Sequence, residues 1–237
     1  MQQIVCRLAK GGPAKYVSHL DLMRAVERGA RRAGLPLAHT EGFNPRPKIA
    51  SASALAVGAT SEAELLVIEL AQPCDPLEVK DRLNASLPEG LRILQAWAHP
   101  AYKQKFAIGE MDIAEFRITV EGPVDPERLG RAVADFLEAD EFAVARVKDE
   151  REKQVNIRPF VLALDVLESE RRRAVLRLRV WLSPTGSART EEVLQAIGIA
   201  PPGFRVAVHR TALYASGHSG KQAKQRLERM LPRRSAP

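Results

Sequence analysis

The chain has 237 residues and a formal net charge of +7, and 45% of its residues are hydrophobic. That is enough apolar material for one large or two small packed domains, and no apolar run approaches the ~20 residues of a membrane span. Its two cysteines, Cys6 and Cys74, are too few for a disulfide framework or a cysteine-ligated metal cluster. The N-terminal segment lacks the apolar core of a signal peptide, so we expect a soluble cytoplasmic protein without metal or cofactor.

The first hundred residues contain six predicted elements. Ser18 is suited to cap a helix, and Gly34 with Pro36 is suited to end it. Asp75 and Pro76 are suited to open a second helix. The expected elements are a strand at 2–10, a helix from Ser18, strands at 48–57 and 64–70, a helix at 75–89 and a strand at 91–99. This β-α-β-β-α-β order predicts a ferredoxin-like domain over residues 1–102.

The same order recurs after a polar stretch, which predicts a second ferredoxin-like domain over residues 111–215. A segment around 155–169 fits the pattern poorly and is treated as an insertion. The expected strands are 113–122, 141–150, 172–184 and 204–215, and the expected helices are 125–139 and 190–198. We therefore predict an α+β protein of two ferredoxin-like (βαββαβ) halves with antiparallel sheets, followed by a basic tail at 216–237.

The excess of basic residues favours an acidic partner, of which nucleic acid is the commonest. The tail alone carries six Lys and Arg against one Glu. In the last strand, His209 and Thr211 share one face and Arg210 takes the other. Cations that alternate with apolar residues are ordinary on an edge strand, so we assign Arg210 no function.

Residues 18–21 read SHLD and place a serine, a histidine and an aspartate in four positions. Ser18 and Asp21 suit a helix start, because a serine hydroxyl accepts from main-chain N–H groups and an aspartate favours the positive end of the helix dipole. His19 could instead bind a ligand, or act as a general base oriented by Asp21. A spacing of two residues does not place them face to face on a helix. We predict no catalytic residue and keep His19 as a candidate RNA- or phosphate-binding residue.

Arg24, Arg28 and Arg31 follow at i, i+4 and i+7, which places them on one face of the helix. Such a stripe is either an ordinary solvated face or a surface that binds phosphates. Glu27 partly offsets it through a pair with Arg31.

The loop EGFNPRPK beyond this helix favours the binding interpretation, because its prolines and glycine stiffen it and its polar and aromatic residues suit a functional loop. Phe43 is a candidate platform for base stacking, Asn44 can bond a base, and Arg46 and Lys48 can hold phosphates. We expect the loop to fold back beside the helix start. His19, Asn44 and Arg46 would then converge on one phosphate or base.

Two further basic residues are candidates for phosphate binding in the second half. Arg158 lies in KQVNIRPF, where the alternative is a strand end with Ile157 and Phe160 in the core. Arg189 ends the glycine-containing loop SPTGSAR ahead of a helix, a position that can take a phosphate. The alternative there is a plain turn with Thr190 as the cap.

The segment KYVSHLDLMRAVERGARRAGLPLAHTEGFNPRPKI closely resembles the opening signature of the radical-SAM-linked proteins, a bacterial family of unknown function. The segments KQVNIRPFVLALDV, GSARTEEVLQAIG and HRTALYA are similar to the same family, so the resemblance covers nearly the whole chain. It implies a partner, because members occur beside or fused to radical S-adenosylmethionine (SAM) enzymes. This chain lacks the iron–sulfur cysteines and the cobalamin-binding segment of the fused members, so any radical chemistry would belong to a separate polypeptide.

We therefore predict an RNA-binding accessory protein that works with a separate radical SAM enzyme in RNA modification. One alternative is an RNA-processing or RNA-modifying enzyme, since paired ferredoxin-like domains resemble pseudouridine synthases and repeat-associated ribonucleases at the level of fold. A synthase would need a catalytic Asp in a basic cleft, and a ribonuclease would need His19 as its base. The other alternative is a scaffold that binds no nucleic acid.

Overall fold

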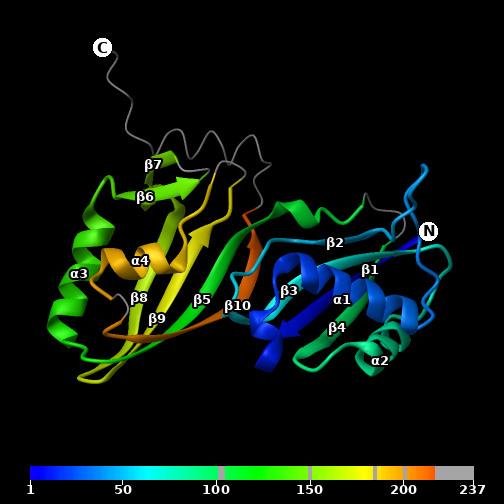
Figure 1. The fold of residues 1–237 in the computed structure, drawn as a ribbon, viewed down its shortest axis with the longest axis horizontal. Coiled ribbons are helices and arrows are strands. Elements are labelled where there is room, and N and C mark those ends of the chain that lie inside the picture. Colours follow the sequence, from blue (N-terminus) through cyan, green and yellow to red (C-terminus); the bar gives the residue numbers. More distant parts are fainter. Residues whose placement is uncertain (101–104, 149–150, 184–185, 200–201, 217–237) are drawn as a thin grey trace, which may run out of the picture. The chain divides into compact units, whose positions relative to one another are not determined.

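The structure is a computed structural model that describes residues 1–100, 105–148, 151–183, 186–199 and 202–216 (Figure 1). These residues form a mixed α+β fold with four α-helices and mostly antiparallel strand pairing. They divide into two compact units: Met1–Met111 with His209–Leu213, and Asp112–Val208 with the residues from Tyr214 on. Most of the predicted basic tail, residues 217–237, lies outside the described residues.

The first unit contains the six elements expected from the sequence, in the expected order. In chain order it has β1 (Gln2–Lys10), the 3-10 helix η1 (Gly12–Tyr16), α1 (His19–Arg32), β2 (Ile49–Ser51), β3 (Thr60–Leu70), α2 (Pro76–Ser86), β4 (Leu91–His99) and the 3-10 helix η2 (Ile108–Glu110). Its strands are ordered β4-β1-β3-β2, and all these pairs are antiparallel. His209 and Arg210 add a short parallel pairing to β3.

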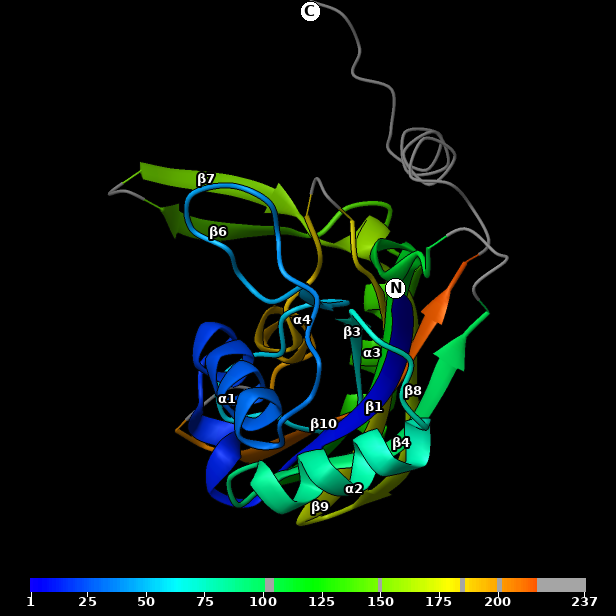
Figure 2. The same cartoon turned by 90° about the vertical axis from the view of Figure 1, so that its right-hand side faces the viewer.

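The core of the first unit lies between this sheet and the two helices, which cover the same face (Figures 1 and 2). Every second residue of the middle of β1, namely Ile4, Cys6 and Leu8, is fully buried in this cluster. Val26 and Ala30 of α1 are fully buried as well, one helical turn apart. The alternating side chains of β1 and the side chains one turn apart on α1 thus pack in the same apolar layer.

The strand expected at 48–57 is much shorter in the structure, because β2 ends at Ser51. The Ala52 N–H still donates to the Leu65 carbonyl of β3, and the chain beyond it bonds to other elements. The Gly58 N–H donates to the Lys15 carbonyl at 2.8 Å, and the Ala54 carbonyl accepts from Arg210 at 2.9 Å. The predicted second helix also ends earlier than expected, at Ser86 rather than directly before Gly90.

The second unit follows the order strand, helix, hairpin, two strands, helix, strand. Its elements are β5 (Met111–Glu121), α3 (Pro126–Glu138), β6 (Ala143–Lys148), β7 (Arg151–Asn156), the 3-10 helix η3 (Arg158–Phe160), β8 (Val161–Glu170), β9 (Arg173–Trp181), α4 (Thr190–Ala196) and β10 (Arg205–Ala215). Its main sheet is ordered β10-β5-β9-β8, and β6 and β7 form a separate two-stranded sheet.

The strand expected at 141–150 therefore does not join the main sheet as predicted. It is β6, which pairs only with β7 among the described strands, while β8 from the segment treated as an insertion occupies the place in the sheet. The physical reason is the burial of apolar side chains in the main sheet. Val161 and Leu164 of β8 are buried there, whereas β7, the partner of β6, is largely exposed. With the β6–β7 hairpin set aside, the order β10-β5-β9-β8 corresponds position by position to β4-β1-β3-β2.

Candidate nucleic-acid interface

The start of α1 is capped as the sequence predicts. The Asp21 N–H donates to Ser18 Oγ at 3.2 Å, and Ser18 Oγ donates to Asp21 Oδ2 at 2.8 Å. Arg24 Nη1 donates to the other carboxylate oxygen at 3.1 Å. These bonds from Ser18 and Arg24 hold the pKa of the Asp21 carboxyl below its ordinary value. Asp21 is thereby tied to its own helix and turned away from the role of a partner for His19.

His19 is the first residue of α1, and its ring meets the end of β2. Its Nε2 lies 3.3 Å from Ser51 Oγ, and its Nδ1 is enclosed with no hydrogen-bond partner among the described residues. A serine–histidine pair acts as a nucleophile and base only when a third group orients the histidine. No described carboxylate bonds Nδ1, so the pair lacks that third group.

The arginine stripe of α1 is exposed, as the helical spacing predicts. Arg24 pairs with Asp21, and Arg31 Nη2 lies 2.8 Å from Glu27 Oε1. Arg28 has no ion-pair partner among the described residues. Exposed i,i+3 and i,i+4 pairs of this kind are weak, so Arg24 and Arg31 remain able to exchange their carboxylates for phosphates.

The loop after α1 is a closed hairpin. The Thr40 N–H donates to the Arg46 carbonyl at 2.8 Å, the Arg46 N–H donates to Thr40 Oγ1 at 3.0 Å, and His39 and Pro47 form a β-bridge. We call residues 39–47 the exposed hairpin. Gly42 has φ +114, a backbone conformation that an L-residue rarely adopts, and so it makes the turn possible.

Phe43 lies at the tip of the exposed hairpin and is completely solvent-exposed, at 111% of its reference area. Asn44 and Arg46 beside it are also exposed, and neither side chain has a partner among the described residues. The hairpin rises away from α1 and α2 in both views (Figures 1 and 2). It therefore presents an aromatic ring, an amide and a guanidinium together to solvent.

The expected convergence of His19, Asn44 and Arg46 is wrong. His19 contacts Ser51 at one end of β2, whereas Arg46 bonds Thr40 in the hairpin that precedes the other end of β2. The His19 Nδ1 atom is enclosed, whereas the Asn44 and Arg46 side chains are exposed to solvent, so the three do not meet at one phosphate. The sequence expectation failed because the chain enters the sheet at β2 before it reaches the helix start.

Lys48 lies where the exposed hairpin returns to the sheet. Its N–H donates to the Ala38 carbonyl, and its carbonyl accepts from the Glu69 N–H. Burial would raise the pKa of Glu69, but hydrogen bonds from Lys105 and Gln3 and the nearby charge of Lys48 hold it below its ordinary value. Lys48 is thus a half-buried cation at the base of the hairpin.

A buried cluster of charges was missed by the sequence analysis. Lys10, Glu64 and Arg210 are 1%, 4% and 2% exposed. Arg210 Nη1 donates to Glu64 Oε1 at 3.0 Å, and Lys10 Nζ donates to the Val17 carbonyl at 2.8 Å, directly before the cap of α1. Burial lowers the pKa of Lys10, and the charge of Glu64 partly opposes that effect. These three charged residues alternate with apolar residues in their strands, a pattern that is equally typical of a charge exposed to solvent, so their burial was not predicted.

The two candidates in the second unit have different surroundings. Arg158 Nε and Nη2 donate to the Leu137 carbonyl and Nη1 donates to the Val161 carbonyl, and burial lowers the pKa of this guanidinium. Its donors thus join α3 to β8. Arg189 is exposed, and its main-chain N–H donates to Glu192 Oε2 at 2.9 Å at the start of α4.

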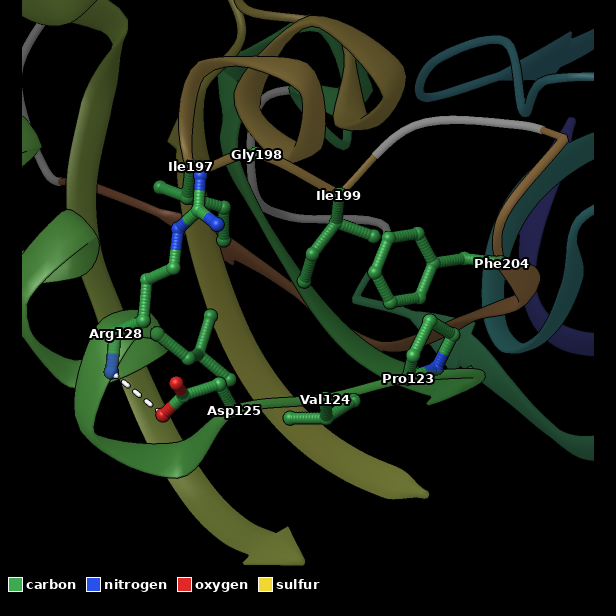
Figure 3. Close-up of a pocket in the computed structure, with 9 residues that line it drawn as sticks. Pro123, Val124, Asp125, Arg128, Ile197, Gly198, Ile199 and Phe204 are labelled. Atoms are coloured by element: carbon green, nitrogen blue, oxygen red, sulfur yellow. Dashed lines mark hydrogen bonds between the residues drawn. The ribbon is translucent and has the colours of Figure 1, made fainter. Parts of the chain in front are cut away.

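Two cavities open at the loops that join β5 to α3 and α4 to β10. The smaller one has a volume of about 230 Å³ and is mostly apolar (Figure 3). In Figure 3, Ile199 and Phe204 face each other, and the Arg128 side chain extends toward Ile197 and Gly198. The larger one, about 570 Å³, shares Pro123 and Phe204 with it.

Two further observations bear on the chemistry that these residues could perform. In the described ranges, no group of three or more His, Cys, Asp or Glu side chains is placed to hold a metal ion. None of the helices in those ranges has the length and apolar character needed to cross a bilayer.

The comparison with solved structures gives matches at low sequence identity. A chain of a Cbf5–Nop10–Gar1 complex aligns with a TM-score of 0.52 and 13% identity over 89% of this chain and 48% of its own length. A chain of an H/ACA RNP bound to a substrate RNA containing 2′-deoxyuridine aligns with a TM-score of 0.44 and 13% identity over 93% of this chain and 48% of its own. The protein thus spans about half the length of these solved chains. At such identity the first match shows a shared fold and nothing more.

Sequence comparison assigns the chain to a protein family. No protein of curated function matches it. A family model described as an uncharacterized protein conserved in bacteria (DUF2344) matches residues 3–191, which is well over half of the chain. The protein therefore belongs to this bacterial family.

Proposed function

We propose that this protein binds single-stranded RNA through its first unit and presents it to a separate radical SAM enzyme in the cytoplasm. The observation that carries the RNA-binding part is the exposed hairpin, with the fully exposed Phe43 ring next to the unpaired Arg46 guanidinium. Bases of single-stranded RNA stack on aromatic side chains, and nearby cations hold their phosphates. The bonds between Thr40 and the Arg46 main chain close the backbone of the hairpin before a ligand arrives, which reduces the backbone entropy lost on binding.

The arginine stripe of α1 supplies a second, less specific part of the proposed interface. Arg28 is exposed with no ion partner among the described residues, and Arg24 and Arg31 are held only by exposed pairs. Contacts of this kind position a nucleic acid without reading its sequence. Sequence preference would therefore come from Phe43 and Asn44 in the hairpin.

The proposed partner rests on the resemblance of residues 15–49 to the radical-SAM-linked proteins. The proposal also takes the two units as ferredoxin-like copies, which is supported by the matching strand orders β4-β1-β3-β2 and β10-β5-β9-β8. A pulldown with the tagged full chain from native cells, after chemical crosslinking, tests the partner. Recovery of a radical SAM enzyme supports the proposed partner. Repeated pulldowns without such an enzyme would refute the partner, whereas RNA binding is tested separately.

The test of RNA binding uses fluorescence anisotropy with a labelled single-stranded RNA of about 12 nucleotides. Phe43→Ala should weaken binding by about 1–3 kcal/mol, the usual cost of losing one stacked base, and should leave the salt dependence unchanged. Arg46→Ala should instead lower the slope of log affinity against log salt by about 0.7, the value for one lost phosphate contact on a single strand.

Two matched variants make this test sharper. Phe43→Leu keeps an apolar side chain at the hairpin tip but removes the ring face, so stacking predicts a loss close to that of Phe43→Ala. Trp97→Ala removes another exposed aromatic residue of the same unit and should leave binding unchanged. Wild-type affinity in Phe43→Ala would refute the proposed interface.

An enzyme acting alone is the second candidate, and the contact between His19 and Ser51 is the observation that favours it. Incubation of the purified protein with its bound RNA separates the two proposals. Cleavage or modification that His19→Ala abolishes, with binding intact, would establish catalysis at the start of α1. Binding without turnover supports the accessory role.

A further inference from the structure

The larger cavity of the second unit, of about 570 Å³, gathers arginines from separate parts of the chain. Arg172 comes from the turn between β8 and β9, Arg173 is the first residue of β9, and Arg205 is the first residue of β10. The end of β5 supplies Glu121 and Gly122. We call this site the arginine cavity.

The charges of the arginine cavity are largely uncompensated. Arg172 and Arg205 are exposed, and neither has an ion-pair partner among the described residues. Arg173 Nη1 lies 2.7 Å from Glu168 Oε2, and Glu168 also pairs with Arg117. Glu121 is the one acidic residue among those that line the cavity. Arg172 and Arg205, which have no ion pair among the described residues, outnumber Glu121, and Arg173 shares its carboxylate with Arg117, so the site has a positive potential.

The main chain around the arginine cavity is held in place before any ligand binds. The Gly122 N–H donates to the Arg172 carbonyl at 3.1 Å, which joins the end of β5 to the β8–β9 turn. Gly122 has φ +154, and a Cβ atom there would lie 2.6 Å from Phe204 Cδ1 and 2.8 Å from the Gly203 carbonyl oxygen. Only glycine allows the loop of Phe204 to approach this closely, so the wall of the cavity depends on it.

We propose that the arginine cavity is a phosphate-binding site that takes a phosphate ester. Guanidinium groups match phosphate oxygens with paired, planar donors, and arginines from separate segments can approach one phosphate from different sides. A volume of about 570 Å³ is within the range of small-molecule sites and exceeds what a bare phosphate fills. The ligand therefore carries an organic group beside Phe204, as a free nucleotide or a nucleotide within RNA does.

This site is independent of the interface proposed for the first unit, because the two share no residue. Loss of RNA binding at the exposed hairpin would leave the arginine cavity intact. Variants of Phe43 and Arg46 should bind a phosphate ester in the cavity as the wild type does.

The test compares two double variants of the full chain with the same change in charge. Arg172→Ala with Arg205→Ala removes the two unpaired cations of the cavity. Arg131→Ala with Arg151→Ala removes two exposed arginines of the same unit that do not line it. Each protein is titrated with inorganic phosphate, uridine 5′-monophosphate and a single-stranded RNA of about 12 nucleotides, by calorimetry at low salt, after thermal unfolding has confirmed that it is folded.

The proposal predicts a loss of at least about tenfold in affinity for one of the esters in the cavity variant and wild-type affinity in the control variant. A loss for the mononucleotide identifies a free phosphorylated small molecule as the ligand. A loss confined to RNA, with a salt slope lower by about 0.7 for each lost contact, identifies the RNA backbone. Equal affinity of both double variants for all three probes, or binding of inorganic phosphate alone, would overturn the proposal.

Discussion

Arg210 and Glu64 form an almost completely enclosed ion pair in the first unit. Arg210 Nη1 lies 3.0 Å and 3.2 Å from the two carboxylate oxygens, and the side chains are 2% and 5% exposed. Lys10, at 1% exposure, adds a second cation whose charge interacts with the same carboxylate. One buried carboxylate therefore compensates the charge of two buried cations, so the stability of the first unit should depend on which of the three charges is removed.

Loss of Glu64 should destabilise the protein more than loss of Arg210. Removal of one partner from a buried ion pair costs about 3–5 kcal/mol, because the other charge stays buried without compensation. After Arg210→Met, Glu64 still has Lys10 nearby, whereas Glu64→Gln leaves two cations without an anion. Urea unfolding followed by tryptophan fluorescence in a Trp181→Phe background, with Glu62→Gln as an exposed control on the same strand, measures the order. Equal losses, or a larger loss in Arg210→Met, would contradict this account.

Ser18→Ala should cost about 1 kcal/mol of folding free energy through loss of the N-cap bond to the Asp21 N–H. It also removes a hydrogen bond that lowers the pKa of Asp21, so the Asp21 pKa should rise toward its ordinary value. The contribution of Asp21 is present above the pKa of the unfolded chain and is lost as pH falls through the lower folded value. NMR titration of the carboxyl group checks the shift. An unchanged Asp21 pKa in Ser18→Ala would show that Arg24 alone sets it.

The two cysteines should differ sharply in reactivity. Burial raises the pKa of the Cys6 thiol to about 12, whereas Cys74 is only half-buried. Because the thiolate is the reactive form, a disulfide reagent near pH 8 should modify one thiol in the folded protein and two in denaturant. Peptide mapping should place the fast reaction at Cys74. Rapid modification of Cys6 in the folded state would mean that β1 opens on the timescale of the reaction.

Local chemistry was enough to predict several features of the fold. The Ser18 cap, the Asp75 cap and the strand at Gln2–Lys10 each depend on residues close together in the chain, and the structure confirms them. The strand at Ala143–Lys148 was recognised as a strand but assigned to the wrong sheet. Alternation predicts an extended chain and does not identify the strand that it pairs with.

The features that depend on distant residues could not be predicted from one sequence. Arg210 pairs with Glu64 across 146 positions, and its strand pattern looked like an ordinary solvated edge. Arg172 and Arg205 likewise come together only through the fold. The contacts of Arg158 could not be predicted either, because its guanidinium donates to the distant Leu137 carbonyl as well as to the Val161 carbonyl, and its binding role stays a prediction.

The ion pair between Arg146 of β6 and Glu192 of α4 should make the second unit less stable in acid. Arg146 Nε and Nη2 donate to the two Glu192 oxygens at 2.6 Å and 2.7 Å, and Nη2 also donates to the Ser187 carbonyl. Burial would raise the pKa of Glu192, but hydrogen bonds from Arg146 and the Arg189 N–H outweigh it and hold the pKa below its ordinary value. The stabilisation is therefore present above the unfolded pKa of about 4.3 and lost as pH falls through the folded value.

Glu192→Gln should accordingly cost about 1.5–3 kcal/mol near pH 7, the usual range for hydrogen bonds to a charged group, and much less near pH 3. Urea unfolding in a Trp97→Phe background measures this, because the buried Trp181 then reports on the second unit alone. Glu191→Gln changes the same charge on the exposed neighbouring position and should have little effect at either pH. Hydrogen exchange of β6 amides should rise in Glu192→Gln, since this pair joins β6 to α4. A difference between Glu192→Gln and the wild type that stays constant from pH 7 to pH 3 would show that the carboxylate charge plays no part.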